Sequence, residues 1–268
     1  QDVEKIENRI QEHMRILGTI LNEIEEKKPT TEQEIFNIYN RNLGKEEFSR
    51  IAILYKDGKT STSDGEIVDL SEDINYFFES DKMQISKRRY SKVNNSEVNI
   101  YSKKTIFNGK SVVILLVIET EKYEEMFTQK IYNGTGMEYI ITNEGDIVAN
   151  SEVKDKKINI FEEMKQINDK EIEKVEKMKE ILSNNTLGQM IYSIKEHNYY
   201  IAFEKLDIEN WILVVITPAS TIAEELNNLL KIILIVLTII SVIIFIIILY
   251  ILISNVKKKE DLYKLAYI

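Results

Sequence analysis

Residues Met137–Ser151 read MEYIITNEGDIVANS, in which strand-forming residues stand on both sides of the Glu144-Gly145 pair. Alternating side chains joined by a short turn that contains Gly are typical of a β-hairpin. An earlier stretch, FSRIAILYKDGKTSTSDG at Phe48–Gly65, repeats this pattern around Asp57-Gly58. The chain therefore contains two hairpins of one kind, and they set the expected fold.

Further strands are predicted after each hairpin. The first is followed by Glu97–Ile106 and Lys110–Glu119, joined at Asn108-Gly109, a dipeptide typical of tight hairpin turns. The second is followed by Gly188–Lys195, Tyr199–Leu206 and Trp211–Thr217. We expect helices at Thr120–Tyr132 and over most of the charged stretch Lys154–Asn184. Two strands, a helical insert and further antiparallel strands, repeated once, predict an α+β fold of two tandem modules.

The N-terminal region is predicted to be helical. Residues 2–26 carry apolar side chains at spacings of three and four, which is typical of an amphipathic helix, and Pro29 ends it. Thr31 and Glu34 have the spacing of a capping box for a second helix, whose inner face would be Ile35, Phe36, Ile38 and Tyr39. We expect the long helix to be a spine for both modules. A coiled-coil dimer seam is the alternative, but the repeat lasts only about three heptads.

Residues Ile232–Ile253 read IILIVLTIISVIIFIIILYILI, without a charge, Gly or Pro. At about 1.5 Å per residue this helix would cross a hydrocarbon core about 30 Å thick. The lysines at 257–259 favour the cytoplasmic side, so we expect residues 1–231 to lie outside the cell. A buried core helix or a signal peptide fits this length and position less well. Residues 219–230 keep helical spacing, which predicts one continuous helix that transmits displacement into the membrane.

Composition narrows the class of function. The 268 residues carry a formal charge of −9 and no Cys, which argues against a nucleic-acid partner and against disulfides. His13 and His197 are the only histidines, and neither has a second ligand at metal-site spacing, so we predict no metal and no cofactor. The chain contains no nucleophile-elbow, phosphate-loop or dinucleotide-binding motif. We therefore predict no catalytic residues and no enzyme activity in this chain.

The order of long helix, two strand-turn-strand modules and membrane helix resembles the double Cache sensor domain, a pair of PAS-like folds in bacterial transmembrane receptors. In the second module NYYIAFEKLDIENWILVVITPASTI, Asn198–Ile222, resembles the closing strands of the family, including Trp211 and Pro218. In the first, DINYFFESDKMQIS, Asp73–Ser86, resembles the Asp-x-x-Tyr-Phe segment of that module, and NIYSKKTIFNGKSVVILLVIETEKY, Asn99–Tyr123, resembles the two strands that close it. The resemblance implies a helical spine at 1–44, a membrane-distal module at 45–132, a membrane-proximal module at 133–218, a juxtamembrane helix at 219–231, a transmembrane helix at 232–254 and a cytoplasmic stub at 255–268.

The resemblance also implies a ligand site in the distal module, between its sheet and its helical insert. The residues that we expect to line it are Tyr76, Arg88, Arg89, Tyr90, Tyr101 and Glu119. An Arg binds both oxygens of a carboxylate and a facing Glu binds an ammonium group, so the predicted ligand is an amino acid or another small carboxylate. Alternatively, 87–89 is an exposed loop and Glu119 an edge-strand charge. The first module lacks the Trp of the amino-acid-binding pattern, which puts amino acids in particular in doubt. A second site would use Tyr139, Asn150 and Phe203, whereas Trp211 is interpreted as core.

The C-terminal residues KKKEDLYKLAYI resemble the short helix that leads into GGDEF domains of diguanylate cyclases, although Ile268 stands where the family usually has Thr. This resemblance implies a homodimeric protein whose missing output domain makes cyclic di-GMP. Because Gln1 opens straight into a helical pattern and an exported domain needs an export signal, we also expect a natural N-terminus upstream, with a first transmembrane helix. The sensor of a histidine kinase or of a chemoreceptor is an alternative. An adhesion or dimerisation ectodomain without a small ligand is another.

Overall fold

The computed structural model describes residues 2–42, 48–66, 70, 73–91, 95–124, 127, 135–151, 159–167, 171–194, 197–209 and 211–266. The chain divides into two units, Gln1–Pro218 and Ala219–Ile268. The first unit contains two antiparallel sheets with helices on their faces, and the second is a single helix. The α+β class and the two-sheet architecture predicted from the sequence are confirmed. The predicted boundaries at 44/45 and 132/133 lie outside the described residues.

Two helices open the chain, α1 (Asp2–Lys27) and α2 (Glu32–Asn42). The predicted cap of α2 is present, because the backbone N–H of Glu34 donates to the Thr31 hydroxyl at 3.3 Å. The Glu34 carboxylate accepts from the backbone N–H of Thr30 at 2.7 Å, one residue earlier than in the usual capping box. Ile35, Phe36, Ile38 and Tyr39 are buried, as their spacing predicts.

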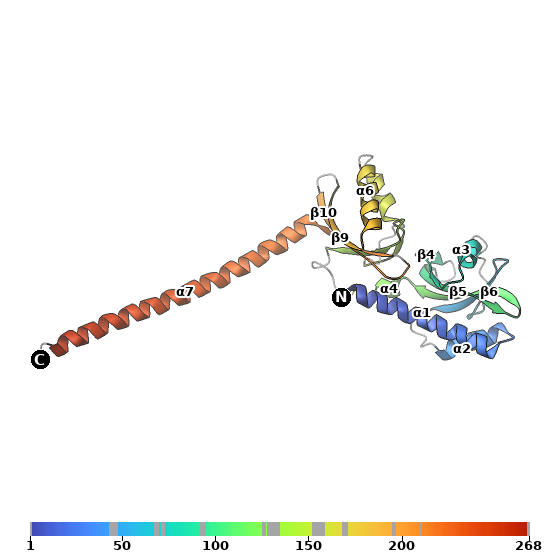
Figure 1. Ribbon diagram of the computed structural model, residues 1–268, viewed down its shortest axis with the longest axis horizontal. Coiled ribbons are helices and arrows are strands. Elements are labelled where there is room, and N and C mark those ends of the chain that lie inside the picture. Colours follow the sequence, from blue (N-terminus) through green and yellow to red (C-terminus); the bar gives the residue numbers. More distant parts are fainter. Residues whose placement is uncertain are drawn as a thin grey trace. The chain divides into compact units, whose positions relative to one another are not determined.

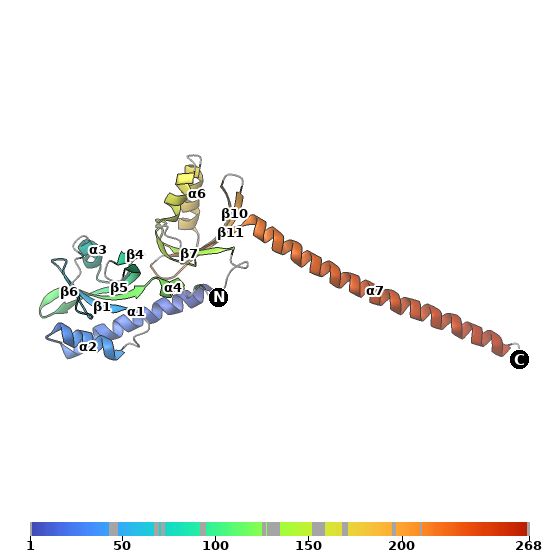
Figure 2. The ribbon, with the colours of Figure 1, turned by 180° about the vertical axis from the view of Figure 1, so that it is seen from behind.

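The first sheet has the strand order β2-β1-β6-β5-β3, with β4 also paired to β5. Its strands are β1 (Arg50–Tyr55), β2 (Thr60–Thr62), β3 (Gln84–Ile85), β4 (Arg89–Ser91), β5 (Ser96–Phe107) and β6 (Lys110–Glu119). Asn108 and Gly109 link β5 to β6 with φ of 48° and 73°, the left-handed conformation that tight hairpin turns require. The helices α1 and α2 cover one face of this sheet, and α3 (Ile74–Glu79) lies on the other (Figures 1 and 2).

Strand β6 shows how the two faces of the first sheet are built. Side chains alternate along a strand, so Val112, Ile114, Leu116 and Ile118 pack in the cluster that contains α1. Val113, Leu115 and Val117 pack instead in a separate cluster with Phe77 of α3. We call these the α1 face and the α3 face. Both are apolar on β6, which explains its continuous hydrophobic run.

The second sheet has the order β8-β7-β11-β10-β9. Its strands are β7 (Met137–Ile141), β8 (Ile147–Asn150), β9 (Leu187–Ile194), β10 (His197–Lys205) and β11 (Ile212–Pro218). The helices α5 (Ile160–Ile167) and α6 (Glu171–Asn184) pack on it through a cluster that includes Phe161, Val175 and Met178. Between the sheets the structure describes α4 (Glu121–Glu124), and most of the rest of the predicted Thr120–Tyr132 helix lies outside the described residues.

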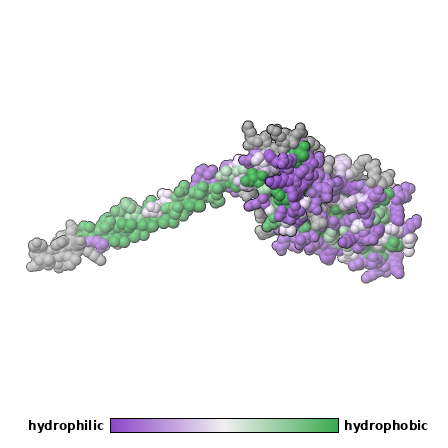
Figure 3. Space-filling model, turned by 45° about the horizontal axis from the view of Figure 1, so that its top comes forward, coloured by the Kyte–Doolittle hydropathy of each residue, from purple (hydrophilic) through white to green (hydrophobic). Residues whose placement is uncertain are grey.

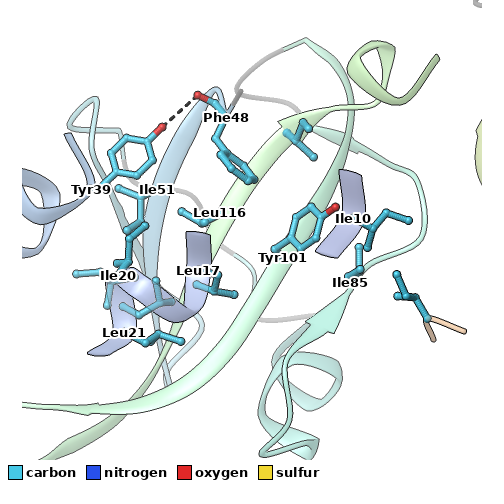
Figure 4. Close-up of a cluster of buried hydrophobic side chains, with 14 of the residues drawn as sticks. Ile10, Leu17, Ile20, Leu21, Tyr39, Phe48, Ile51, Ile85, Tyr101 and Leu116 are labelled. Atoms are coloured by element: carbon cyan, nitrogen blue, oxygen red, sulfur yellow. Dashed lines mark hydrogen bonds between the residues drawn. The ribbon is translucent and has the colours of Figure 1, made fainter. Parts of the chain in front are cut away.

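One buried cluster joins α1 to both sheets. It takes Ile10 from α1, Tyr101 from the first sheet, and Ile140, Trp211 and Leu213 from the second module. Figure 4 shows Ile10, Leu17 and Leu21 of α1 beside Tyr101 and Leu116. The long helix is therefore the shared spine that its apolar stripe predicts. Trp211 is a core residue as expected, but it belongs to this shared cluster and not to the second module's own core.

The second unit is α7 (Ala219–Ala266), an unbroken helix of 48 residues. Its part Ala219–Val256 is long and apolar enough to cross a membrane, and its most apolar window has a mean hydropathy of 3.7. None of that window is buried. The visible surface of α7 in Figure 3 is hydrophobic along most of its length. The side of the membrane on which each end lies stays a prediction.

Candidate functional site

The α3 face of the first sheet brings two of the predicted site residues together. Arg89 of β4 lies opposite Val98 of β5, and Val98 lies opposite Glu119 of β6. Directly opposed residues in antiparallel strands point to the same face, so Arg89 and Glu119 flank Val98. The Arg89 guanidinium lies 5.3 Å from the Phe77 ring centroid, which identifies this as the α3 face. One cation and one anion thus stand on one face, as predicted for a zwitterion site.

Arg89 already has an anionic partner within the protein. Its Nη2 lies 2.5 Å from Asp73 Oδ1, and the two side chains are 25% and 33% exposed. Ion pairs with this much solvent access contribute little to stability, about 0–1 kcal/mol. A carboxylate from solution can therefore replace Asp73 at small cost, while Phe77 keeps the guanidinium oriented.

The strongest anion-binding feature of this face is Arg50, which the sequence interpretation missed. Arg50 opens β1 opposite Val117 of the α3 face, and its side chain is only 12% exposed. Nη1 lies 3.0 Å from Asp64 Oδ2, but the buried Nε has no hydrogen-bond partner among the described residues. A buried donor without an acceptor is costly and rare, so such a group indicates a place where a further acceptor binds.

Ser102 is a second such group on the same face. It follows Val98 and Ile100 at period two along β5 and lies opposite Leu115. The residue is 1% exposed, and its hydroxyl has no hydrogen-bond partner among the described residues. Ser102 and Arg50 stand on the two strands that flank β6, opposite Leu115 and Val117 of the α3 face.

The charge of Arg50 is partly balanced by Asp64. Burial opposes ionisation of Asp64 and is the largest single effect, but the Thr62 hydroxyl bond, the Arg50 charge and backbone N–H groups together outweigh it. The net result lowers the pKa of Asp64, so this carboxylate stays ionised at neutral pH. Two carboxylates then face the Arg50 cation, because Glu66 Oε2 also lies 3.8 Å from Nη1, and it is the acceptor-free Nε that is left for a ligand oxygen.

The other predicted residues lie elsewhere. Tyr101 is wholly buried on the α1 face, and its hydroxyl lies 2.9 Å from His13 Nδ1 of α1. It points away from α3 because it falls between Ile100 and Ser102 in the strand alternation. Tyr90 is 60% exposed and donates to Asn95 Oδ1. The Tyr76 hydroxyl donates to the backbone carbonyl of Ile85 at 3.1 Å.

Arg88 is buried at the contact between the two modules. Its side chain is 4% exposed, Nε lies 3.2 Å from Glu97 Oε2, and Nη1 donates to Asn150 Oδ1 at 2.8 Å. These contacts between the two modules explain why Arg88 and Asn150 are buried, so a ligand is not required to account for it. Tyr139 and Phe203, the other residues of the second predicted site, are part of the second module's core.

Two further observations concern other kinds of site. Among the described residues no group of three or more His, Cys, Asp or Glu side chains is arranged to hold a metal ion. A depression of about 370 Å³ lies at the turn between β1 and β2, and its lining residues are Tyr55, Lys56, Asp57, Lys110 and Ser111. It lies at the Lys110–Ser111 end of β6, whereas Val117 and Glu119 lie at the other end of this strand.

Comparison with known proteins identifies the fold. No protein-family model and no curated protein matches the chain. Among solved structures, the extracellular domain of rpHK1S-Z16, assigned as a histidine kinase, has a TM-score of 0.61 at 14% identity, covering 83% of this chain and 93% of that one. The ligand-binding domain of the Pseudomonas aeruginosa PAO1 amino acid chemoreceptor PctC, in complex with GABA, has a TM-score of 0.57 at 10% identity, covering 81% and 94%.

A third similar structure is the ligand-binding domain of the Pseudomonas fluorescens chemoreceptor CtaA in complex with L-alanine. Its TM-score is 0.55 at 10% identity, and the match covers 82% of this chain and 93% of that one. These neighbours are Cache-type sensor domains, so the predicted fold is confirmed. At such low identity the likeness establishes the fold alone.

Proposed function

We propose that the first unit is the extracellular sensing region of a membrane-anchored signalling protein, and that it binds a small carboxylate on the α3 face. The buried Arg50 guanidinium with its acceptor-free Nε carries this proposal. A guanidinium in a site that is largely shielded from solvent binds a carboxylate through two parallel hydrogen bonds, which gives both affinity and orientation. The fold supports the proposal, because its neighbours are sensory domains.

The preferred ligand class is a zwitterion. Arg50 and Arg89 provide two cations for carboxylates, and Glu119 provides an anion for an ammonium group on the same face. GABA and L-alanine, which are bound to two of the neighbours, carry both groups. A simple carboxylate would use the arginines alone, so Glu119 distinguishes the two classes.

The test is a binding screen on the full chain in lipid nanodiscs. A panel of carboxylates, amino acids and amines is scored by thermal shift and then by calorimetry. We expect Arg50→Met to abolish binding of every hit, and Glu119→Gln to weaken only those that carry an ammonium group. The matched control is Arg41→Met, the same chemical change at a 59% exposed side chain on α2. Absence of any hit, or a hit that Arg50→Met binds equally well, would refute the proposal.

We propose that α7 carries the signal across the membrane to an output domain in a homodimer. The continuous helix from Ala219 to Ala266 supports a rigid relay, since a flexible linker would absorb displacement. The tail resemblance favours a diguanylate cyclase as the output. A histidine kinase is the second candidate, because rpHK1S-Z16 is assigned as one. Sequencing the gene beyond Ile268 and assaying cyclic di-GMP in cells decides between these outputs.

A further inference from the structure

The three successive basic residues Lys87, Arg88 and Arg89 each bind a different partner. Arg89 binds Asp73 and Phe77 on the α3 face. Arg88 donates to Asn150 of β8, and the Lys87 ammonium group donates to Asp146 Oδ2 at 2.7 Å, directly before β8. One short segment therefore contacts the candidate ligand site with one residue and the second module with the two residues before it.

A third bond fixes the same strand of the second module. Asn99, which is wholly buried, donates from Nδ2 to the backbone carbonyls of Ser86 and Val148, each at 3.2 Å. Its Oδ1 accepts from the Thr120 hydroxyl at 2.9 Å, so the amide is held from both sides. The strand β8 is an edge strand of its sheet. Side chains of the first module thus bind this edge, which would otherwise expose unpaired backbone groups.

The geometry couples these contacts. Arg88 and Arg89 are joined by one planar peptide unit, so a displacement of the Arg89 backbone also moves that of Arg88. The Arg88 side chain is 4% exposed and is bound at both Nε and Nη1, so it transmits a displacement of its backbone. On the other side, Val148 packs in the shared cluster with Trp211.

We propose that Lys87–Arg89 is the mechanical link that passes the state of the ligand site to the second module, with Arg88 and Asn150 as its positioning residues. The idea rests on the proposed function for its biological meaning. In the structure Arg89 is bound to Asp73. A ligand carboxylate that takes the place of Asp73 shifts β4, and Arg88 carries that shift to β8.

The test needs no ligand, because Asp73→Asn removes the internal partner of Arg89. The full chain in nanodiscs is examined by amide hydrogen exchange of β7 and β8 and by the emission of Trp211, the only tryptophan. We expect Asp73→Asn to change the exchange protection of β8 by about fivefold or more, the size of typical coupling. Asp81→Asn is the matched control, since Asp81 pairs with Lys104 away from this link. It should leave β8 and Trp211 unchanged.

A double-mutant cycle with Arg88→Gln tests whether the effect of Asp73→Asn passes through Arg88. With Arg88→Gln in place, Asp73→Asn should no longer alter β8 or Trp211. Asn150→Ala tests the link from the other module, and it serves if Arg88→Gln fails to fold. An effect of Asp73→Asn that is equal with and without the Arg88–Asn150 contact would overturn the proposal, and so would no effect at β8. A failed ligand screen would count against the proposed function and leave this cycle untouched.

Discussion

The replacement of Gly145 by Ala tests the packing of the second module most directly. Gly145 lies in the turn between β7 and β8 with φ of +87°, where an L side chain is strained. A Cβ there would lie 2.7 Å from Phe161 Cε2 and 2.8 Å from Phe161 Cγ, and it would overlap Cδ2 more closely still. Phe161 is wholly buried and anchors α5 in the core. The substitution therefore strains the backbone and displaces a core ring together.

Substitutions at two other glycines measure the backbone strain and the overpacking separately. Gly109 has φ of +73° with open space around a Cβ, so Gly109→Ala should cost only the left-handed conformation, about 1–2 kcal/mol. At Gly188 the φ is ordinary but a Cβ would lie 2.5 Å from Phe203 Cζ, so Gly188→Ala should cost overpacking alone, about 1–3 kcal/mol. Because Gly145→Ala combines the strained backbone with the overpacking, we expect it to lower the free energy of unfolding by about 2–5 kcal/mol.

Thermal unfolding followed by circular dichroism gives the comparison. For a unit of about 200 residues each kcal/mol lowers Tm by roughly 2–4 °C, so Gly145→Ala should melt about 4–20 °C below the parent. The added change Phe161→Leu should recover part of this loss, since a smaller side chain yields to the new methyl group. If Gly145→Ala and Gly109→Ala have the same Tm, Phe161 does not pack against this turn and the reasoning is wrong.

Three further predictions concern pH, the ligand face and the relay. Burial raises the pKa of Tyr39 to about 12, against an opposing effect of Arg50, whereas the unfolded side chain ionises near 10.0. The folded state thus holds the proton longer, so stability is full below pH 10 and declines as pH rises toward 12; Tyr39→Phe should flatten this decline in denaturant titrations at pH 9 and 11. Arg50→Met removes an unsatisfied donor together with the ion pairs to Asp64 and Glu66, whose side chains are 41% and 57% exposed, so we expect the free energy of unfolding to change by no more than about 1 kcal/mol; a clear loss of Tm would contradict the assignment. In cells, the double change Asn227→Gly with Asn228→Gly should abolish ligand-dependent output, whereas Asn227→Ala with Asn228→Ala should preserve it, because Gly is about 1 kcal/mol per residue less favourable than Ala inside a helix.

The elements that local chemistry determines were predictable. Asn108-Gly109 adopts the left-handed turn that its residue types favour, and Thr31 caps α2 as its spacing predicts. The apolar stripe of α1 identified the helix and its role as a spine, since helical periodicity is set by neighbours in sequence. Such features depend on a few adjacent residues, so one chain contains the information.

The site was predicted in part because strand geometry is sensitive to a single residue. Arg89 and Glu119 lie on one face as expected, but Tyr101 lies on the other, since a shift of one position reverses the face. The pairing of Arg88 could not be predicted, because its partner, Asn150, is 62 residues away in another module. Arg50 had one available signal, a charge in phase with Ala52 and Leu54 in an otherwise apolar strand.

The cluster shared by α1 and both sheets has a consequence for chimeric proteins. Exchange of the first sheet alone would set foreign side chains against Ile10 and Leu17 and would uncover Trp211. The side chains of the new sheet would then not be complementary to those of α1. The natural junction is Pro218, where β11 ends and α7 begins, so domain swaps should exchange everything before it as one block.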